Sequence, residues 1–159
     1  AKSQATLLCD VEMVKQGVTR RLQKGAVHCF LNDPRTPELA LATGETRSMA
    51  AVELWKPLLK DSVILIGNAP TALFRLLELI EQTELIEQTE QIEAGADKPA
   101  LIIGMPVGFV GAQESKEALV EVSERLNVPY ISLSGRRGGS ALTASAWNAC
   151  LRLAEGIRF

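Results

Sequence analysis

Five short apolar segments recur along this chain, and each is followed by a loop and then by a segment with helical periodicity. The apolar segments are ATLLC (5–9), AVHCFL (26–31), SVILIG (62–67), ALIIG (100–104) and PYISL (129–133). They are rich in β-branched residues and apolar throughout, which is typical of parallel strands that are covered on both faces. The repeated strand–loop–helix order predicts a doubly wound α/β fold, a mostly parallel sheet of about five strands with helices on both faces. The 159 residues suffice for one domain, 1–159.

Helical periodicity predicts helices within 10–17, 46–59, 68–81, 114–126 and 140–156. The segment NDPRTPEL (32–39) carries two prolines, and we interpret it as a loop.

A tandem repeat interrupts this pattern. ELIEQT (78–83) recurs at once as ELIEQT (84–89) and decays to EQIEAG (90–95), with no Lys or Arg between Arg75 and Lys98. Six helical residues turn a helix face by about −120°, so Leu85 and Ile86 cannot share the apolar stripe of Leu79 and Ile80. We interpret 78–95 as a duplicated acidic helical insertion that lengthens a solvated helix, and an acidic partner-binding arm is the alternative.

The net charge and the cysteine content argue against several classes of protein. A net charge of −2 and 4% aromatic residues argue against a nucleic-acid or membrane-surface binder. Cys9, Cys29 and Cys150 are too scattered for a disulfide framework or a zinc site, so we expect free thiols in a reducing cytoplasm and no bound metal. No apolar run reaches the ~20 residues of a membrane span, and the N-terminus has no signal-peptide pattern.

Ligands of parallel sheets bind beyond the carboxyl ends of the strands. The segment GNAPTALF follows one strand, with Asn68 as a candidate helix cap and Pro70 in the first helical turn. The amides at this helix start would suit an anion, and an ordinary capped helix is the alternative.

The segment GRRGGS (135–140) follows the last strand and concentrates positive charge at a turn. Gly138 and Gly139 would let the backbone approach a ligand, Ser140 would cap the next helix, and Arg136 and Arg137 would donate to carboxylates or phosphates. Arg47, early in another helix, is a candidate third cation or a plain surface residue.

The loop GMPVGFVGAQ (104–113) has glycines around Phe109 and Val110, which suits an apolar wall more than a phosphate cradle. Neither GxGxxG after the first strand nor GxxxxGK[ST] is present, so both nucleotide fingerprints are missing. His28 lies inside an apolar strand, where a core histidine is favoured over a catalytic one. Asp10 and Asp33 lie at strand ends, where turn or capping roles account for them.

Several of these segments together resemble one family. They are CDVEMVKQGVTR, LNDPRTPELA, TRSMAAVELW, IGNAPTALFRLLELIE, KPALIIGMPVGFVGAQESKEAL and GRRGGSALTASAWNA, from about Leu8 to Leu151, and they resemble precorrin-8X methylmutase (precorrin isomerase) of cobalamin biosynthesis. The resemblance implies a homodimer and a cofactor-free methyl migration that converts precorrin-8X to hydrogenobyrinate, or the equivalent reaction of the cobalt-containing substrate to its cobalt-containing product. It implies these substrate-binding residues: Arg47, Asn68, Pro70, Thr71, Val107, Gly108, Phe109, Arg136, Arg137, Gly138, Gly139 and Ser140.

In that family, a histidine in a further N-terminal segment is thought to protonate the macrocycle. No position here corresponds to it, so we assign no catalytic residue and do not transfer the role to His28. We consider an isomerase body first, and a non-catalytic tetrapyrrole-carboxylate binding protein or one part of a split methylmutase second. An unrelated nucleotide-binding α/β enzyme is disfavoured by the missing fingerprints.

Overall fold

A parallel sheet lies at the centre of the molecule in a computed structural model that describes residues 4–90 and 98–157. Within these ranges the strands are β1 (Leu7–Cys9), β2 (Val27–Cys29), β3 (Val63–Ile66), β4 (Leu101–Gly104) and β5 (Tyr130–Ser132). They pair in the order β2-β1-β3-β4-β5, all parallel. Cys9 is level with both Cys29 and Leu65, so the carboxyl ends of these neighbouring strands meet at one edge. The predicted α/β class is confirmed.

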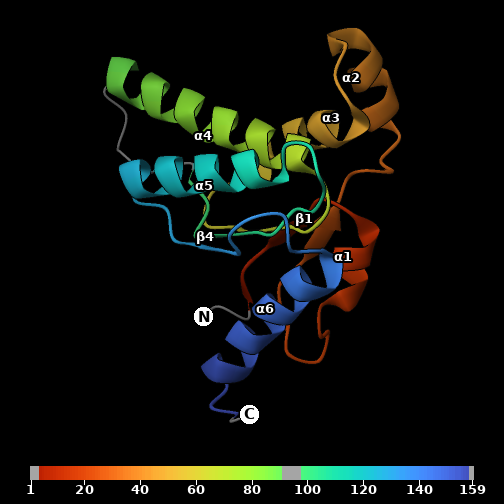
Figure 1. The fold of residues 1–159 in the computed structure, drawn as a ribbon, viewed down its shortest axis with the longest axis vertical. Coiled ribbons are helices and arrows are strands. Elements are labelled where there is room, and N and C mark those ends of the chain that lie inside the picture. The colour runs from red at the N-terminus through yellow and green to blue at the C-terminus, as the bar shows by residue number, and fades with distance from the viewer. Residues whose placement is uncertain (1–3, 91–97, 158–159) are drawn as a thin grey trace.

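Helices cover both faces of the sheet (Figure 1). On one face lie α1 (Glu12–Gly17) and α6 (Ser140–Ala154), and on the other lie α3 (Arg47–Glu53), α4 (Pro70–Glu90) and α5 (Ala112–Leu126). Alternate strand residues point to opposite faces, so Leu7 and Leu65 pack with Trp147, whereas Leu8 and Ile64 belong to the core under α4 and α5. The two apolar faces give the sheet two cores.

The central strands are apolar because both of their faces are covered. Every residue of β1 and β3 is buried, whereas β2 and β5, at the two edges, are half-buried. The nearly continuous apolar segments of the sequence therefore reflect position in the middle of a parallel sheet.

One predicted loop is a helix. The helix α2, Arg35–Thr43, begins within the proline-bearing segment 32–39 that the sequence predicted as a loop, and it continues four residues beyond it. Pro34 is the N-cap and Pro37 lies in the first turn, where the missing N–H has no partner within the helix to lose. The predicted helix 46–59 divides into α3 and a 3₁₀ turn at Lys56–Leu58 (η2).

The tandem repeat continues α4, and residues 91–95 of the interpreted insertion lie outside the described residues. Leu79 and Ile80 are 3% and 1% exposed, whereas Leu85 and Ile86 are 64% and 52% exposed. The predicted loss of the apolar stripe is confirmed. The added copy is solvated at Leu85 and Ile86, as expected, but Glu87 is buried.

Candidate functional site

The order in which the chain adds strands reverses between β1 and β3. The chain passes from β1 to β2 on one side and then returns to form β3 on the other side of β1. Such a switch point is where open parallel sheets bind ligands. In this protein the side chain of Asp10, the residue directly after β1, lies at the switch point. Its Oδ1 accepts a hydrogen bond from Gly67 N at 3.0 Å, and its Oδ2 accepts from Asn68 N and Ala69 N at 2.9 Å each.

Asp10 is 3% exposed, and the three amides that it binds belong to the loop that leads into α4. Burial raises the pKa of its carboxyl above the ordinary 3.8, and the three amide hydrogen bonds oppose that rise. The sequence predicted a turn or capping role for Asp10, whereas its carboxyl binds the amides of the distant loop that leads into α4. The expectation that Asn68 caps the helix is wrong, because α4 begins at Pro70, and the amides of residues 67–69 are not free for a ligand.

The starts of α4 and α6 meet beside this carboxylate. A Cβ added to Gly67 would lie 2.8 Å from Ser140 Cα, so the two chain segments are in direct contact. Asn68 and Thr71 are exposed at the start of α4. The structure thus brings together two of the segments that the sequence singled out, GNAPTALF and GRRGGS. Asp10, at the end of the first strand, contacts the first of them.

The arginine loop, Ser134–Gly139, packs against the end of β4. A Cβ on Gly138 would lie 2.1 Å from Met105 O, and Gly139 N donates to the same oxygen at 2.9 Å. Gly138 therefore serves close packing against the chain itself, and its approach to a ligand stays a prediction. Ser140 is the first residue of α6, and the N-cap is Gly139, so the expectation that Ser140 caps this helix is wrong.

Charge and apolar surface lie side by side at this edge. Arg136 and Arg137 are exposed, and the guanidinium of Arg136 lies over the Phe109 ring, with Cζ 5.6 Å from the ring centroid. Phe109 and Val110 are 84% and 89% exposed. Val107 lies near Gly139, where an added Cβ would be 3.8 Å from Val107 Cγ1, so the loops after β4 and β5 touch.

Two further exposed apolar side chains belong to the helix starts nearby, Met13 in the first turn of α1 and Leu142 in the first turn of α6. An arrangement of exposed aromatic and aliphatic side chains with two guanidinium groups suits a ligand that is both apolar and anionic.

Arg47 lies at the same edge but is engaged elsewhere. Its Nη2 donates to Leu31 O at 3.0 Å and to Asn32 Oδ1 at 2.8 Å, in the loop after β2. Of the predicted cations, the structure therefore groups Arg136 and Arg137 with the apolar loop and holds Arg47 against a different strand end.

Lys116 is a residue that sequence reasoning missed. It is 3% exposed in α5, and its Nζ donates to the carbonyls of Gly135, at 2.9 Å, and of Arg137. Burial lowers the pKa of its ammonium. A signal was present, because Lys116 lies four residues after Ala112 and three before Leu119, on the buried face of the helix.

The remaining candidate titratable groups are peripheral. His28 was favoured as a core histidine over a catalytic one; it is half-buried on edge strand β2 and stacks on Phe30 with ring centroids 5.5 Å apart. Asp33 accepts hydrogen bonds from Arg35 N and Nε at 2.9 Å, and the Arg35 side chain holds the pKa of Asp33 below its usual value. The turn role of Asp33 is thereby confirmed.

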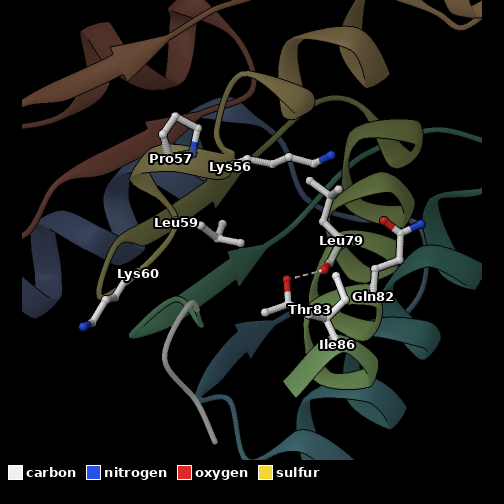
Figure 2. A pocket seen from close by; sticks show the side chains of 8 residues that line it. All are labelled: Lys56, Pro57, Leu59, Lys60, Leu79, Gln82, Thr83 and Ile86. Carbon is white, nitrogen blue, oxygen red and sulfur yellow. Dashed lines mark hydrogen bonds between the residues drawn. The ribbon is translucent and has the colours of Figure 1, made fainter. Parts of the chain in front are cut away.

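Cavities do not by themselves point to the carboxyl edge. A pocket of about 570 Å³ lies between η2 and the C-terminal half of α4, with Lys56 and Lys60 on one side and Leu79, Thr83 and Ile86 on the other (Figure 2). A pocket of about 530 Å³ opens near the amino ends of β3 and β4, lined by residues such as Asp61 and Ala100. At the carboxyl edge, a pocket of about 360 Å³ is lined by Lys116, Ser132, Ser134 and Gly135, among others.

The described residues contain neither a candidate metal site nor a helix that could span a membrane. Among them, no group of three or more His, Cys, Asp or Glu side chains could hold a metal ion, and Cys9, Cys29 and Cys150 are free thiols. No helix in the described ranges is long and apolar enough to cross a membrane.

Comparison with a family model gives two matches to precorrin-8X methylmutase, over residues 1–87 and 81–153. The two matched ranges overlap inside the tandem repeat, as expected if the family has a single copy of that segment.

Individual relatives agree. A precorrin-8X methylmutase of a Sinorhizobium species is 54% identical over 95% of this chain and 66% of its own length, and one of Pseudomonas aeruginosa is 52% identical over 91% and 64%. A solved structure described as precorrin-8X methylmutase from Thermus thermophilus matches 98% of this chain and 69% of that chain with a TM-score of 0.75 and 36% identity. The chain thus spans just under two thirds of the length of the curated relatives named here.

Proposed function

Because the chain belongs to the precorrin-8X methylmutase family, we propose that it binds a corrin precursor at the carboxyl edge of its sheet and takes part in the methyl migration that yields hydrogenobyrinate. The 54% identity to a relative of that name is the observation that carries the proposal. The substrate is precorrin-8X or, in the equivalent reaction with a cobalt-containing product, its cobalt-containing counterpart. The protein acts as a cytoplasmic homodimer without a cofactor.

The chemistry of the carboxyl edge supports this ligand class. A corrin precursor is a broad apolar macrocycle with carboxylates around its rim. Phe109 and Val110 offer exposed apolar area, and Arg136 and Arg137 offer the fork-shaped donors that pair with carboxylates. Asn68, Pro70, Thr71 and the loop around Gly108 complete the wall, and Arg47 meets a carboxylate on the β2 side.

A methyl migration breaks one carbon–carbon bond and forms another within the same molecule, so it needs no electron acceptor. The contribution of this chain is therefore binding and orientation, with positive charge fixed near the carboxylates. A proton donor near the macrocycle would add about 10²–10⁴ in rate, and no residue of this chain is assigned that role.

The test is an anaerobic titration of the chain with precorrin-8X, followed by absorption over time. Conversion to the hydrogenobyrinate spectrum supports the isomerase. A saturable shift without conversion supports the alternative, a tetrapyrrole-carboxylate binding protein or one part of a split methylmutase. An unchanged spectrum at all concentrations contradicts both.

The variant Arg137→Ala tests whether Arg137 binds a carboxylate of the ligand. We expect the affinity for hydrogenobyrinate to fall by about tenfold to a hundredfold, because a charge-assisted hydrogen bond is lost. Arg20→Ala is the matched control, since Arg20 is exposed near the amino end of β2 and lines a different pocket. Equal affinities of the two variants would remove Arg137 from the site.

A further inference from the structure

The ammonium group of Lys116 lies in an unusual position for a lysine. It is almost fully buried, and both of the partners that the described residues provide are main-chain carbonyls, Gly135 O and Arg137 O. A buried charge is costly unless hydrogen bonds replace its water shell. The two carbonyls therefore satisfy Lys116, and Lys116 in turn fixes the two carbonyls.

The arginine loop is tied at both of its ends by other contacts. Before it, Ser132 Oγ donates to Gly104 O at 2.6 Å, and at its end Gly139 N donates to Met105 O at 2.9 Å. Lys116 contacts residues that lie between these two hydrogen bonds in the sequence. Lys116 belongs to α5, an element that packs on α4 and on the sheet and has its own buried face.

The contacts bracket the first arginine. Gly135 and Arg137 are the residues before and after Arg136, and the carbonyls of both accept hydrogen bonds from the Lys116 ammonium. The side chains of Arg136 and Arg137 remain exposed. With both flanking carbonyls fixed, the main chain at Arg136 has little freedom left, and its guanidinium lies over the Phe109 ring.

We propose that Lys116 is a positioning residue for the arginine loop: its ammonium group fixes the main-chain conformation in which Arg136 and Arg137 are presented to a carboxylate-bearing ligand. It does not touch the ligand. Its effect on affinity passes through the loop. The ordering of the loop stands on the geometry alone, whereas the effect on ligand binding rests on the proposed function.

Limited proteolysis with trypsin tests the ordering directly, because Arg136 and Arg137 are themselves the cleavage sites. Lys116→Met keeps the apolar stem and removes the charge. We expect cleavage at these two arginines, identified by mass spectrometry, to become about tenfold faster or more, while cleavage at other sites keeps the wild-type rate. Lys116→Gln retains one donor and should lie between, and it replaces Lys116→Met if that variant does not fold.

Lys98→Met is the matched control. Lys98 is also largely covered and donates to a main-chain carbonyl, Leu126 O at 3.5 Å, but it lies beyond the other end of α5 and pairs with Glu84. It should leave the cleavage rate at Arg136 and Arg137 unchanged. Wild-type cleavage in Lys116→Met, or faster cleavage at every site alike, would overturn the proposal.

Binding of hydrogenobyrinate separates a positioning role from a general loss of stability. Lys116→Met should weaken binding about tenfold, and the loss should vanish when Arg136 and Arg137 are both already alanine, because the loop then has no guanidinium to present. A loss that persists in that background would overturn the positioning role. If the wild-type chain binds no hydrogenobyrinate, the proposed function fails, and the proteolysis result still decides the ordering.

Discussion

The two copies of ELIEQT in α4 have the same six residues and different surroundings. Their local hydrogen bonds are alike, since Thr83 Oγ1 donates to Leu79 O at 2.9 Å and Thr89 Oγ1 donates to Leu85 O at 2.8 Å. Their burial is opposite. In the first copy the adjacent Leu and Ile belong to the core, whereas in the second the same pair is more than half exposed.

The difference shows that position on the helix, rather than local sequence, decides what these residues do. A step of six residues turns the face by about −120°, so the second copy presents a different side to the sheet and to α5. The acidic residues change partners accordingly: Glu78 pairs with Arg75 one turn away, whereas Glu84 pairs with Lys98, which is distant in sequence.

The largest expected effect is on the buried leucine. Leu79→Ala should lower the free energy of unfolding by about 2–5 kcal/mol, because it removes core contacts and leaves a cavity. Leu85→Ala, the same change in the second copy, should stay within about 0.5 kcal/mol of wild type. Urea unfolding measures both. Similar losses for the two variants would mean that the second copy is buried in solution.

Removal of one copy should have an intermediate effect. Deletion of 78–83 and deletion of 84–89 give the same chain, because the copies are identical. We expect the helix to shorten by about 9 Å and the free energy of unfolding to change by less than in Leu79→Ala. Binding of hydrogenobyrinate should be unaffected, since the proposed site lies at the other end of α4. Loss of binding in the deletion variant would connect the repeat to the site.

The smallest expected effect concerns Glu84 and pH. The hydrogen bond from Lys98 holds the pKa of Glu84 below its usual 4.5. An acid with a lowered pKa in the folded state stabilises the protein above its unfolded pKa, and this stabilisation is lost as pH falls through the folded pKa. The stability difference between wild type and Glu84→Gln should therefore be present at about pH 6 and shrink towards about pH 3.

The urea midpoint across this pH range measures the difference, and Glu78→Gln is the matched variant in the first copy. A difference between wild type and Glu84→Gln that does not change with pH would show that the pair with Lys98 does not form.

The fold was largely predictable from the sequence, and the site only in part. The apolar segments of β1, β3 and β4 are continuous because these strands are central, so the parallel class followed from local pattern. The helix α2 was missed because proline suppresses helical prediction, although proline is tolerated in a first turn.

The internal contacts of the site depend on pairs that are distant in sequence. Asp10 and the amides it binds are separated by 57 to 59 positions, and no local pattern of either segment indicates the other. The Lys116 contacts span 19 and 21 positions. Composition indicated that the turn was cationic and the loop after β4 apolar, but only the tertiary structure shows which main-chain groups are already occupied.

The carboxylate of Asp10 has a consequence for selectivity in a crowded cell. The start of α4 is the kind of place where phosphate esters bind, and these are among the most abundant small anions that a metabolic enzyme meets. Because the amides of Gly67, Asn68 and Ala69 already donate to the Asp10 carboxyl, they have no free N–H groups to offer a phosphate ester. Under the proposed function, a ligand carboxylate binds at the arginines instead, and Asp10 restricts which anions this edge accepts without touching the ligand.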